Sequence, residues 1–153
     1  MATGAAPRRF TVDEYFEMAR AGILTEDDRV ELIDGQIIQM SPIGDPHAEA
    51  VNRCNWAFVG LMAAGRVMTS IQNPIRVDRY NDPQPDVVLV PPGLRGAPRV
   101  ADVLLVIEVA DSSLIFDRHT KLPLYARAGI REAWLVDLKA EAVEVHRAPG
   151  LGG

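Results

Sequence analysis

Two acidic residues stand beside or within apolar runs, where a chain usually places hydrophobic side chains. Asp86 directly precedes the run VVLV at positions 87–90, and Glu108 lies near the end of VLLVIEV at positions 103–109. Burying an ionised carboxylate is costly unless a metal ion or a hydrogen-bonded partner compensates. If the two runs are neighbouring strands, both carboxylates lie at one sheet edge and could share a divalent cation. Oxygen ligands of this kind suit Mg²⁺, or Mn²⁺ in its place, rather than zinc.

Lys121 is the third residue of chemical interest. The chain contains 14 Arg and only two Lys, so arginine is its usual cation. A helix is expected from about residue 120, and a cation at the start of a helix is disfavoured by roughly 0.3–1 kcal/mol. The rare lysine and its place at a helix start are both explained if a compact ammonium and the positive helix end act together on a phosphate group.

Each of these residues also has a structural interpretation. Asp86 follows Pro85 and could be a turn residue that opens a strand, and Glu108 could be the buried partner of an arginine. Lys121, taken by itself, could be a solvated surface lysine.

The elements that must position these residues follow from periodicity and turn signals. Thr11 and Glu14 have the spacing of a capping box, and Asp34-Gly35 is a strong hairpin signal. We expect Asp45 to cap a helix with Pro46 at its first position, and Pro123 to lie in the first turn of another. The predicted helices cover about residues 12–21, 45–64 and 120–128. The predicted strands are a hairpin within residues 29–40 and the runs 67–71, 74–77, 87–90, 103–109, 133–138 and 142–147.

This order of elements predicts an α/β fold, a mixed β-sheet flanked by helices. We expect one domain over residues 10–148, a disordered leader over 1–9 and a flexible tail over 149–153. The helix over 45–64 should bury one apolar face, formed by Val51, Cys54, Phe58, Leu61 and Met62. Both tryptophans, Trp56 and Trp134, are expected in the core.

Composition excludes several classes of protein. No apolar run approaches the roughly 18 residues that a membrane helix needs. The single cysteine, Cys54, rules out an intramolecular disulfide framework, so a reducing, cytoplasmic location is expected. The net charge of −5 argues against tight binding of nucleic acid by charge alone. The excess of acids lies in residues 1–65, with 5 Arg against 10 acids, and the remainder is balanced.

The motifs and their order resemble the PD-(D/E)xK nuclease superfamily, and most closely its bacterial Uma-type family of restriction-endonuclease-like proteins. The resemblance spans about residues 10–147. It rests on six motifs that follow one another along the chain. They are the VELIDG hairpin (30–35), the S-P-x-x-x-x-H stretch (41–47), PDVVLV (85–90), IEV (107–109), D-x-x-x-K-L-P-L-Y-A-x-A-G (117–129) and WLVD (134–137).

The resemblance implies a restriction-endonuclease-like core and Mg²⁺-dependent hydrolysis of phosphodiester bonds, most naturally in DNA. Asp86 and Glu108 match the family's metal-binding acids, with the carbonyl of Val109 as a further ligand. Glu31 matches an acidic residue that the family brings to the site from its N-terminal part. The parent motif would place its lysine at position 110, which is alanine here, so the resemblance implies that Lys121 takes that role.

Several alternatives stay open from the sequence alone. Glu31 could be an exposed hairpin acid. The position of His47 favours a packed histidine of the first helical turn over a catalytic residue. Asp117 reads better as a capping or ion-pairing residue than as a ligand. The function could be that of a DNA endonuclease, or that of a catalytically silent relative that binds nucleic acid or protein. The family often continues with further strands after the point where this sequence stops, so we also expect a homodimer that covers a sheet edge.

Overall fold

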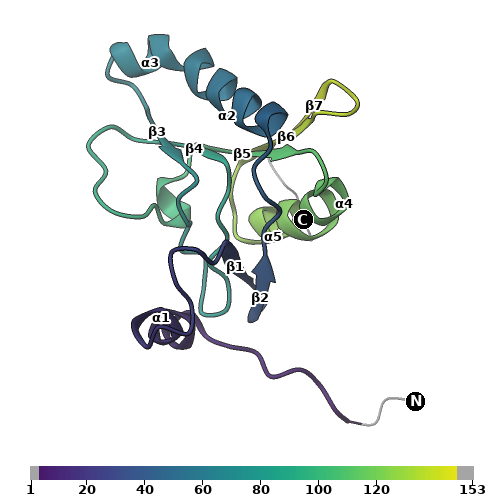
Figure 1. Cartoon of the computed structure of the whole chain (residues 1–153). Coiled ribbons are helices and arrows are strands. Elements are labelled where there is room, and N and C mark those ends of the chain that lie inside the picture. Colours follow the sequence, from purple (N-terminus) through teal and green to yellow (C-terminus); the bar gives the residue numbers. More distant parts are fainter. Residues whose placement is uncertain (1–3, 148–153) are drawn as a thin grey trace.

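A five-stranded mixed sheet forms the centre of the protein (Figure 1). The computed structural model describes residues 4–147, so the tail expected at 149–153 and the start of the expected leader lie outside the described residues. The strand order is β3-β4-β5-β6-β7, in which only β5 and β6 run parallel. The strands are β3 Met68–Ile71, β4 Val87–Val90, β5 Leu105–Ala110, β6 Glu132–Asp137 and β7 Ala142–Arg147.

Helices cover both faces of this sheet. One face carries α2 (Asp45–Ala57) and the short α3 (Val59–Ala63), seen along the top of Figure 1. The other face carries a helical run made of α4 (Leu114–Phe116), a π-helical turn (Asp117–Lys121) and α5 (Leu122–Arg127). All six residues of β5 are buried, since apolar side chains pack on both of its faces. The expected α/β fold with a central buried strand is confirmed.

The hairpin forms a separate two-stranded sheet of β1 (Val30–Ile33) and β2 (Gln36–Gln39). Its turn residues Asp34 and Gly35 have φ of 51° and 73°, the positive values that a two-residue hairpin turn of this kind requires. The backbone N–H of Asp82 donates to the carbonyl of Leu32 at 2.8 Å. This bond ties the hairpin to the loop that leads into β4.

Helix α1 (Val12–Arg20) begins with the expected capping box. The Glu14 N–H donates to Thr11 Oγ1 at 3.2 Å, and the Thr11 N–H donates to Glu14 Oε1 at 3.0 Å. A short 3₁₀ helix (Val100–Asp102) precedes β5. No helix of the described residues is long and apolar enough to cross a membrane.

Three of the expected elements differ from the structure: the strand over 74–77 and the helices over 45–64 and 120–128. Residues 74–77 form no strand; Pro74 has no N–H to offer a partner strand, and Ile75 is instead anchored by an N–H bond to Pro83 O at 2.9 Å. The helix expected over 45–64 breaks at Phe58, whose ψ of 5° is not helical, and its N-cap is Gly44 instead of Asp45.

The expected core position of Trp56 is wrong, because its side chain is 62% exposed. Helix α2 packs on the sheet through Val51, Cys54 and Phe58. Trp56 is two positions from both Cys54 and Phe58, which places it on another side of the helix. Trp134 packs against the core cluster on this face of the sheet, as expected.

The expected helix start at residue 120 is also wrong, because the helical run already begins at Leu114. The turn Asp117–Lys121 is widened to the π form, with the Leu122 N–H donating to Asp117 O. Proline lacks an N–H and its ring crowds the carbonyl four residues before it, so a widened turn accommodates Pro123 within the run. Lys121 therefore lies inside a helical run, away from the positive helix end expected from the sequence.

Candidate active site

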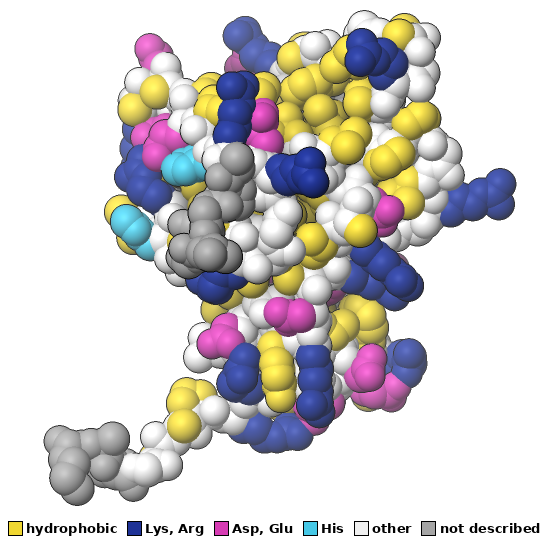
Figure 2. Space-filling model, turned by 180° about the vertical axis from the view of Figure 1, so that it is seen from behind, with side chains coloured by type: hydrophobic (Ala, Val, Ile, Leu, Met, Phe, Trp, Pro, Cys, Tyr) yellow, Lys and Arg dark blue, Asp and Glu magenta, His cyan; other side chains and the backbone are white. Residues whose placement is uncertain are grey.

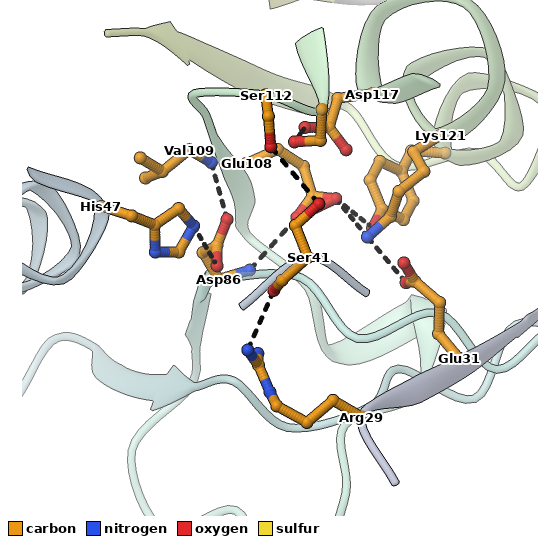
Figure 3. Close-up of polar contacts among 12 residues, drawn as sticks. Arg29, Glu31, Ser41, His47, Asp86, Glu108, Val109, Ser112, Asp117 and Lys121 are labelled. Atoms are coloured by element: carbon orange, nitrogen blue, oxygen red, sulfur yellow. Dashed lines mark hydrogen bonds and ion pairs between the residues drawn. The ribbon is translucent and has the colours of Figure 1, made fainter. Parts of the chain in front are cut away.

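Two hydrogen bonds hold Asp86, which directly precedes β4, against Glu108 and Val109 of the antiparallel neighbour β5 (Figure 3). The backbone N–H of Asp86 donates to Glu108 Oε1 at 3.2 Å. The backbone N–H of Val109 donates to Asp86 Oδ2 at 2.7 Å. Each carboxylate is thus oriented by the backbone of the strand that carries the other. The structure brings these two acids together where β4 begins beside β5, in the interior of the sheet and not at its edge.

Lys121 completes a buried ionic cluster with two glutamates. Its Nζ lies 2.5 Å from Glu108 Oε2 and 2.8 Å from Glu31 Oε1. Its side chain is only 4% exposed, so the interpretation of Lys121 as a solvated surface lysine is wrong. Glu31 is buried as well, and its Oε1 also accepts the Gln84 N–H at 3.0 Å. The interpretation of Glu31 as an exposed hairpin acid is therefore wrong too.

Burial and charge oppose each other in this cluster. Burial raises the pKa of Glu108 well above its usual range, and the attraction of the Lys121 ammonium works against that shift. Burial by itself would lower the pKa of Lys121, but the carboxylate of Glu108, with smaller help from Glu31, keeps that pKa well above its usual value. Lys121 is therefore held protonated by its partners.

Tyr125 is a member of the cluster that was not expected from the sequence. Its buried hydroxyl donates to Glu108 Oε2 at 3.2 Å, and burial raises its pKa well above the usual value. The Glu108 carboxylate thus accepts from three donors, the Asp86 N–H, Lys121 and Tyr125. Tyr125 follows Lys121 by four residues, the spacing that puts two side chains on one helix face, and this was the available signal.

His47 faces Asp86 from the first turn of α2. Its Nε2 lies 3.1 Å from Asp86 Oδ1, and its side chain is mostly buried. The hydrogen bond to Asp86 raises the pKa of His47, and burial opposes that change. The sequence favoured a packed histidine here but left a role near the cleft open, and the structure places His47 in polar contact with a candidate site residue.

Asp117 lies in the π-helical turn and is buried at the same cavity. It accepts a hydrogen bond from Ser113 Oγ at 2.6 Å. Burial raises its pKa to about 6, while Lys121 and the Ser113 bond pull the value down. The bond from Ser113 joins two side chains, and the turns around Asp117 have no side-chain cap bond, so the capping interpretation is not supported. Its burial at the cavity that Lys121 also lines makes Asp117 part of the charged cluster.

All of these residues except Tyr125 line one cavity of about 300 Å³ between the hairpin, the start of α2 and the helical run. The acids along its wall outnumber the bases, so a bound phosphate needs a cation beside it. The acidic lining residues are Glu31, Asp86, Glu108, Asp111 and Asp117, and the basic ones are Arg29, His47 and Lys121.

The donor set fits Mg²⁺ better than a metal that needs a complete protein cage. No group of three or more His, Cys, Asp or Glu side chains among the described residues is arranged to hold a metal ion. Mg²⁺ commonly uses one or two carboxylates and keeps several waters. Asp86 and Glu108 offer hard carboxylate oxygen atoms to one cavity and would suit that requirement.

Comparison with known proteins identifies the same fold and family. A crystal structure of a "putative nuclease belonging to DUF820", from Anabaena variabilis, matches with a TM-score of 0.72 and 18% sequence identity. The match covers 92% of this chain and 81% of that one, and it shows a shared fold. A search of curated proteins found no match. Residues 12–153 match the family Uma2, described as "Putative restriction endonuclease". The expected family is confirmed: this chain belongs to the Uma2 family.

Proposed function

We propose that the protein is a Mg²⁺-dependent endonuclease that hydrolyses phosphodiester bonds in DNA. The proposal rests on one observation: two hydrogen bonds hold Asp86 and Glu108 together at one cavity, and the buried Lys121 ammonium lies 2.5 Å from Glu108. The family and the solved structure of similar fold are both described as nucleases, which supports the same class of reaction.

The carboxylates of Asp86 and Glu108 would hold Mg²⁺, or Mn²⁺ in its place, with the carbonyl of Val109 as a further ligand. When bound, the ion would supply Lewis-acid activation of a water molecule and of the scissile phosphate. The acidic excess of the cavity supports a metal requirement, since the cavity by itself repels a phosphodiester.

Residues of the chain itself supply a positive charge to the site and orient its carboxylates. Lys121 provides a fixed positive charge beside Glu108, where it would orient the nucleophile or stabilise negative charge that develops on the phosphate. Glu31 holds Lys121 at 2.8 Å, so its geometry favours positioning of the lysine over a second metal position. His47 and the Val109 N–H fix both oxygen atoms of Asp86, and Tyr125 fixes Glu108.

We expect the substrate to be contacted mainly at the site itself. Figure 2 shows basic side chains interspersed with acidic, apolar and polar ones on the face opposite to that of Figure 1, without one continuous basic surface. Together with the net charge of −5, this arrangement supports weak, salt-sensitive binding of DNA and little sequence specificity.

The single cysteine supports a cytoplasmic location, and the exposed edge strand β7 supports a homodimer. Both stay predictions.

Nicking of supercoiled plasmid DNA tests the enzymatic proposal. We expect nicking by the wild-type protein with Mg²⁺ or Mn²⁺, and none with EDTA. Asp86→Asn keeps the shape of a partly exposed side chain and removes one candidate ligand oxygen, so nicking should fall at least about 100-fold. Glu49→Gln, an exposed change on α2 that lies outside the cavity, is the matched control and should nick like the wild type.

Binding of Mn²⁺, followed by electron paramagnetic resonance, separates metal binding from activity. The wild-type protein should bind Mn²⁺ and Asp86→Asn should bind it more weakly. Wild-type protein that nicks equally well in EDTA, or Asp86→Asn that nicks as fast as Glu49→Gln, would refute the proposed mechanism.

A second candidate function is supported by one observation. The Glu108 carboxylate is already satisfied by three protein donors, so the cluster is stable without a metal ion. A catalytically silent relative that binds nucleic acid or a protein partner would show this property. A gel-shift assay in EDTA distinguishes it: DNA binding that persists, with no nicking of plasmid DNA or of RNA under any metal condition, favours this candidate.

A further inference from the structure

A second cavity, of about 590 Å³, lies between α1, the loop after it and the start of the hairpin. Tyr15 and Phe16 of α1 form part of its wall, with Leu24 from the loop after α1 and Pro74 from the segment after β3. A space of this size, partly aromatic and apolar, is typical of pockets for small organic groups. Gln84, whose N–H donates to Glu31, lines both cavities, but none of the charged residues of the proposed catalytic cluster lines this one.

Asp82 lines this cavity and is 4% exposed. Its backbone N–H bonds to Leu32, but its side-chain Oδ1 is buried and has no hydrogen-bond partner among the described residues. An unsatisfied buried carboxylate oxygen is unusual in a folded protein and calls for a donor. Burial raises the pKa of Asp82 to about 6.

The charges around Asp82 indicate which donor fits. The described lining residues include the acids Glu26, Asp28 and Asp82 and no Lys, Arg or His. Arg76 lowers the pKa of Asp82 from outside the cavity, where its guanidinium lies over the Phe16 ring, 5.8 Å from the centroid. An anion would be repelled here. The aromatic and apolar part of the wall, formed by Tyr15, Phe16 and Leu24, favours an organic cation over a hydrated metal ion.

We propose that this cavity binds an organic cation, a guanidinium or primary ammonium group, whose N–H donors satisfy Asp82. The aliphatic part of such a ligand would pack on Leu24 and Pro74, and its charge would lie near the rings of Tyr15 and Phe16, which attract cations. Glu26 and Asp28 at the same cavity add to the negative potential. The proposal is independent of the nuclease function, because it uses none of the cluster around Glu108.

Two ligands of matched shape test the role of charge. n-Butylguanidinium and the neutral n-butylurea are titrated into the protein while the amide signals of Gly22, Leu24 and Thr25 are followed by NMR. The cation should shift these signals to saturation, and the urea should bind at least about tenfold more weakly. The amide of Gly93, which does not line the cavity, reports nonspecific change.

Variants assign the binding to Asp82. Asp82→Asn removes a buried charge and should fold, and it should weaken binding of the cation about tenfold or more. The control Asp27→Asn removes an exposed acid that does not line the cavity and should leave binding unchanged. Should Asp82→Asn fail to fold, Glu26→Gln serves as the second variant, with a smaller loss of affinity expected. Equal binding of the cation and the urea, equal loss in Asp82→Asn and Asp27→Asn, or no saturable shift would overturn the proposal.

The source of the cation is a separate arm of the same titration. A short amidated peptide with one arginine between glycines is compared with n-butylguanidinium. Tighter binding of the peptide supports a polypeptide side chain as the occupant, and equal or weaker binding supports a small molecule.

Discussion

The buried cluster of Lys121 with Glu31 and Glu108 should make Lys121 necessary for folding as well as for catalysis. Lys121→Met keeps most of the side-chain volume and removes the charge. It leaves two buried carboxylates without the ammonium that lies 2.5 Å and 2.8 Å from them. Removing one partner of a buried ion pair costs about 3–5 kcal/mol. For a chain of this size, each kcal/mol lowers the melting temperature by roughly 2–4 °C, so we expect a fall of about 6–20 °C.

The chain offers a matched control in its only other lysine, Lys139, which is exposed. Lys139→Met should change stability by no more than about 0.5 kcal/mol. Urea unfolding of both variants and the wild type, in EDTA at pH 7.5, gives the comparison. The double variant Lys121→Met with Glu108→Gln should be more stable than Lys121→Met alone, because it also removes an uncompensated charge.

The pH dependence of Lys121→Met follows from the sign of the Glu108 shift. Burial already raises the pKa of Glu108, and loss of Lys121 removes the attraction that opposes this shift. A carboxyl group with a raised pKa in the folded state binds protons more strongly there, so lower pH stabilises the fold. The destabilisation should thus be smaller at pH 5 than at pH 7.5. Equal stability of Lys121→Met and Lys139→Met at pH 7.5 would refute the reasoning.

Three further predictions concern local features of the chain. Gly35→Ala should lower the stability by about 1 kcal/mol or more beyond the loss in Gly129→Ala. Both glycines have positive φ, but a Cβ at position 35 would lie 2.5 Å from Arg9 Cβ, whereas a Cβ at position 129 would meet nothing within 4 Å. Equal melting temperatures would contradict this. Burial raises the Asp117 pKa from 3.8 to about 6, so wild-type stability falls as pH rises between those values. Asp117→Asn should therefore stabilise the protein by up to about 3 kcal/mol at pH 7.5 and leave its stability unchanged near pH 3. Urea unfolding across that pH range checks the slope, and a slope that persists in Asp117→Asn would assign it elsewhere. Thr11→Ala should cost about 1 kcal/mol by removing the helix cap, measured by thermal unfolding, and no loss would mean that the cap is replaced by solvent.

Several features could be predicted because their causes are local. The capping box at Thr11 and the Asp34-Gly35 turn each depend on a few neighbouring residues, and both are confirmed. The burial of β5 follows from its continuous apolar run. The break at Phe58 and the exposed Trp56 could not be predicted with the same ease, because they depend on how α2 meets the sheet.

The position of Lys121 was predicted for a reason that the structure does not support. The expected helix start at residue 120 gave Lys121 a role at a positive helix end, but the run begins at Leu114 and widens into a π turn before Pro123. Lys121 nevertheless belongs to the candidate site. Its role in the structure comes from Glu31 and Glu108, which are far from it in the chain.

The sequence by itself determined the α/β fold, the family and the choice of Asp86, Glu108, Lys121 and Glu31 as site residues, because apolar runs, turns and motifs can be read without knowing distances. Only the tertiary structure decided how these residues contact one another. It added Tyr125 to Glu108 and His47 to Asp86. It also showed that Asp82 is buried at a second cavity without a partner for Oδ1 among the described residues. The physical reason is that a buried charge is stabilised by groups brought to it from distant segments, and their spacing along the chain does not encode which of them will meet.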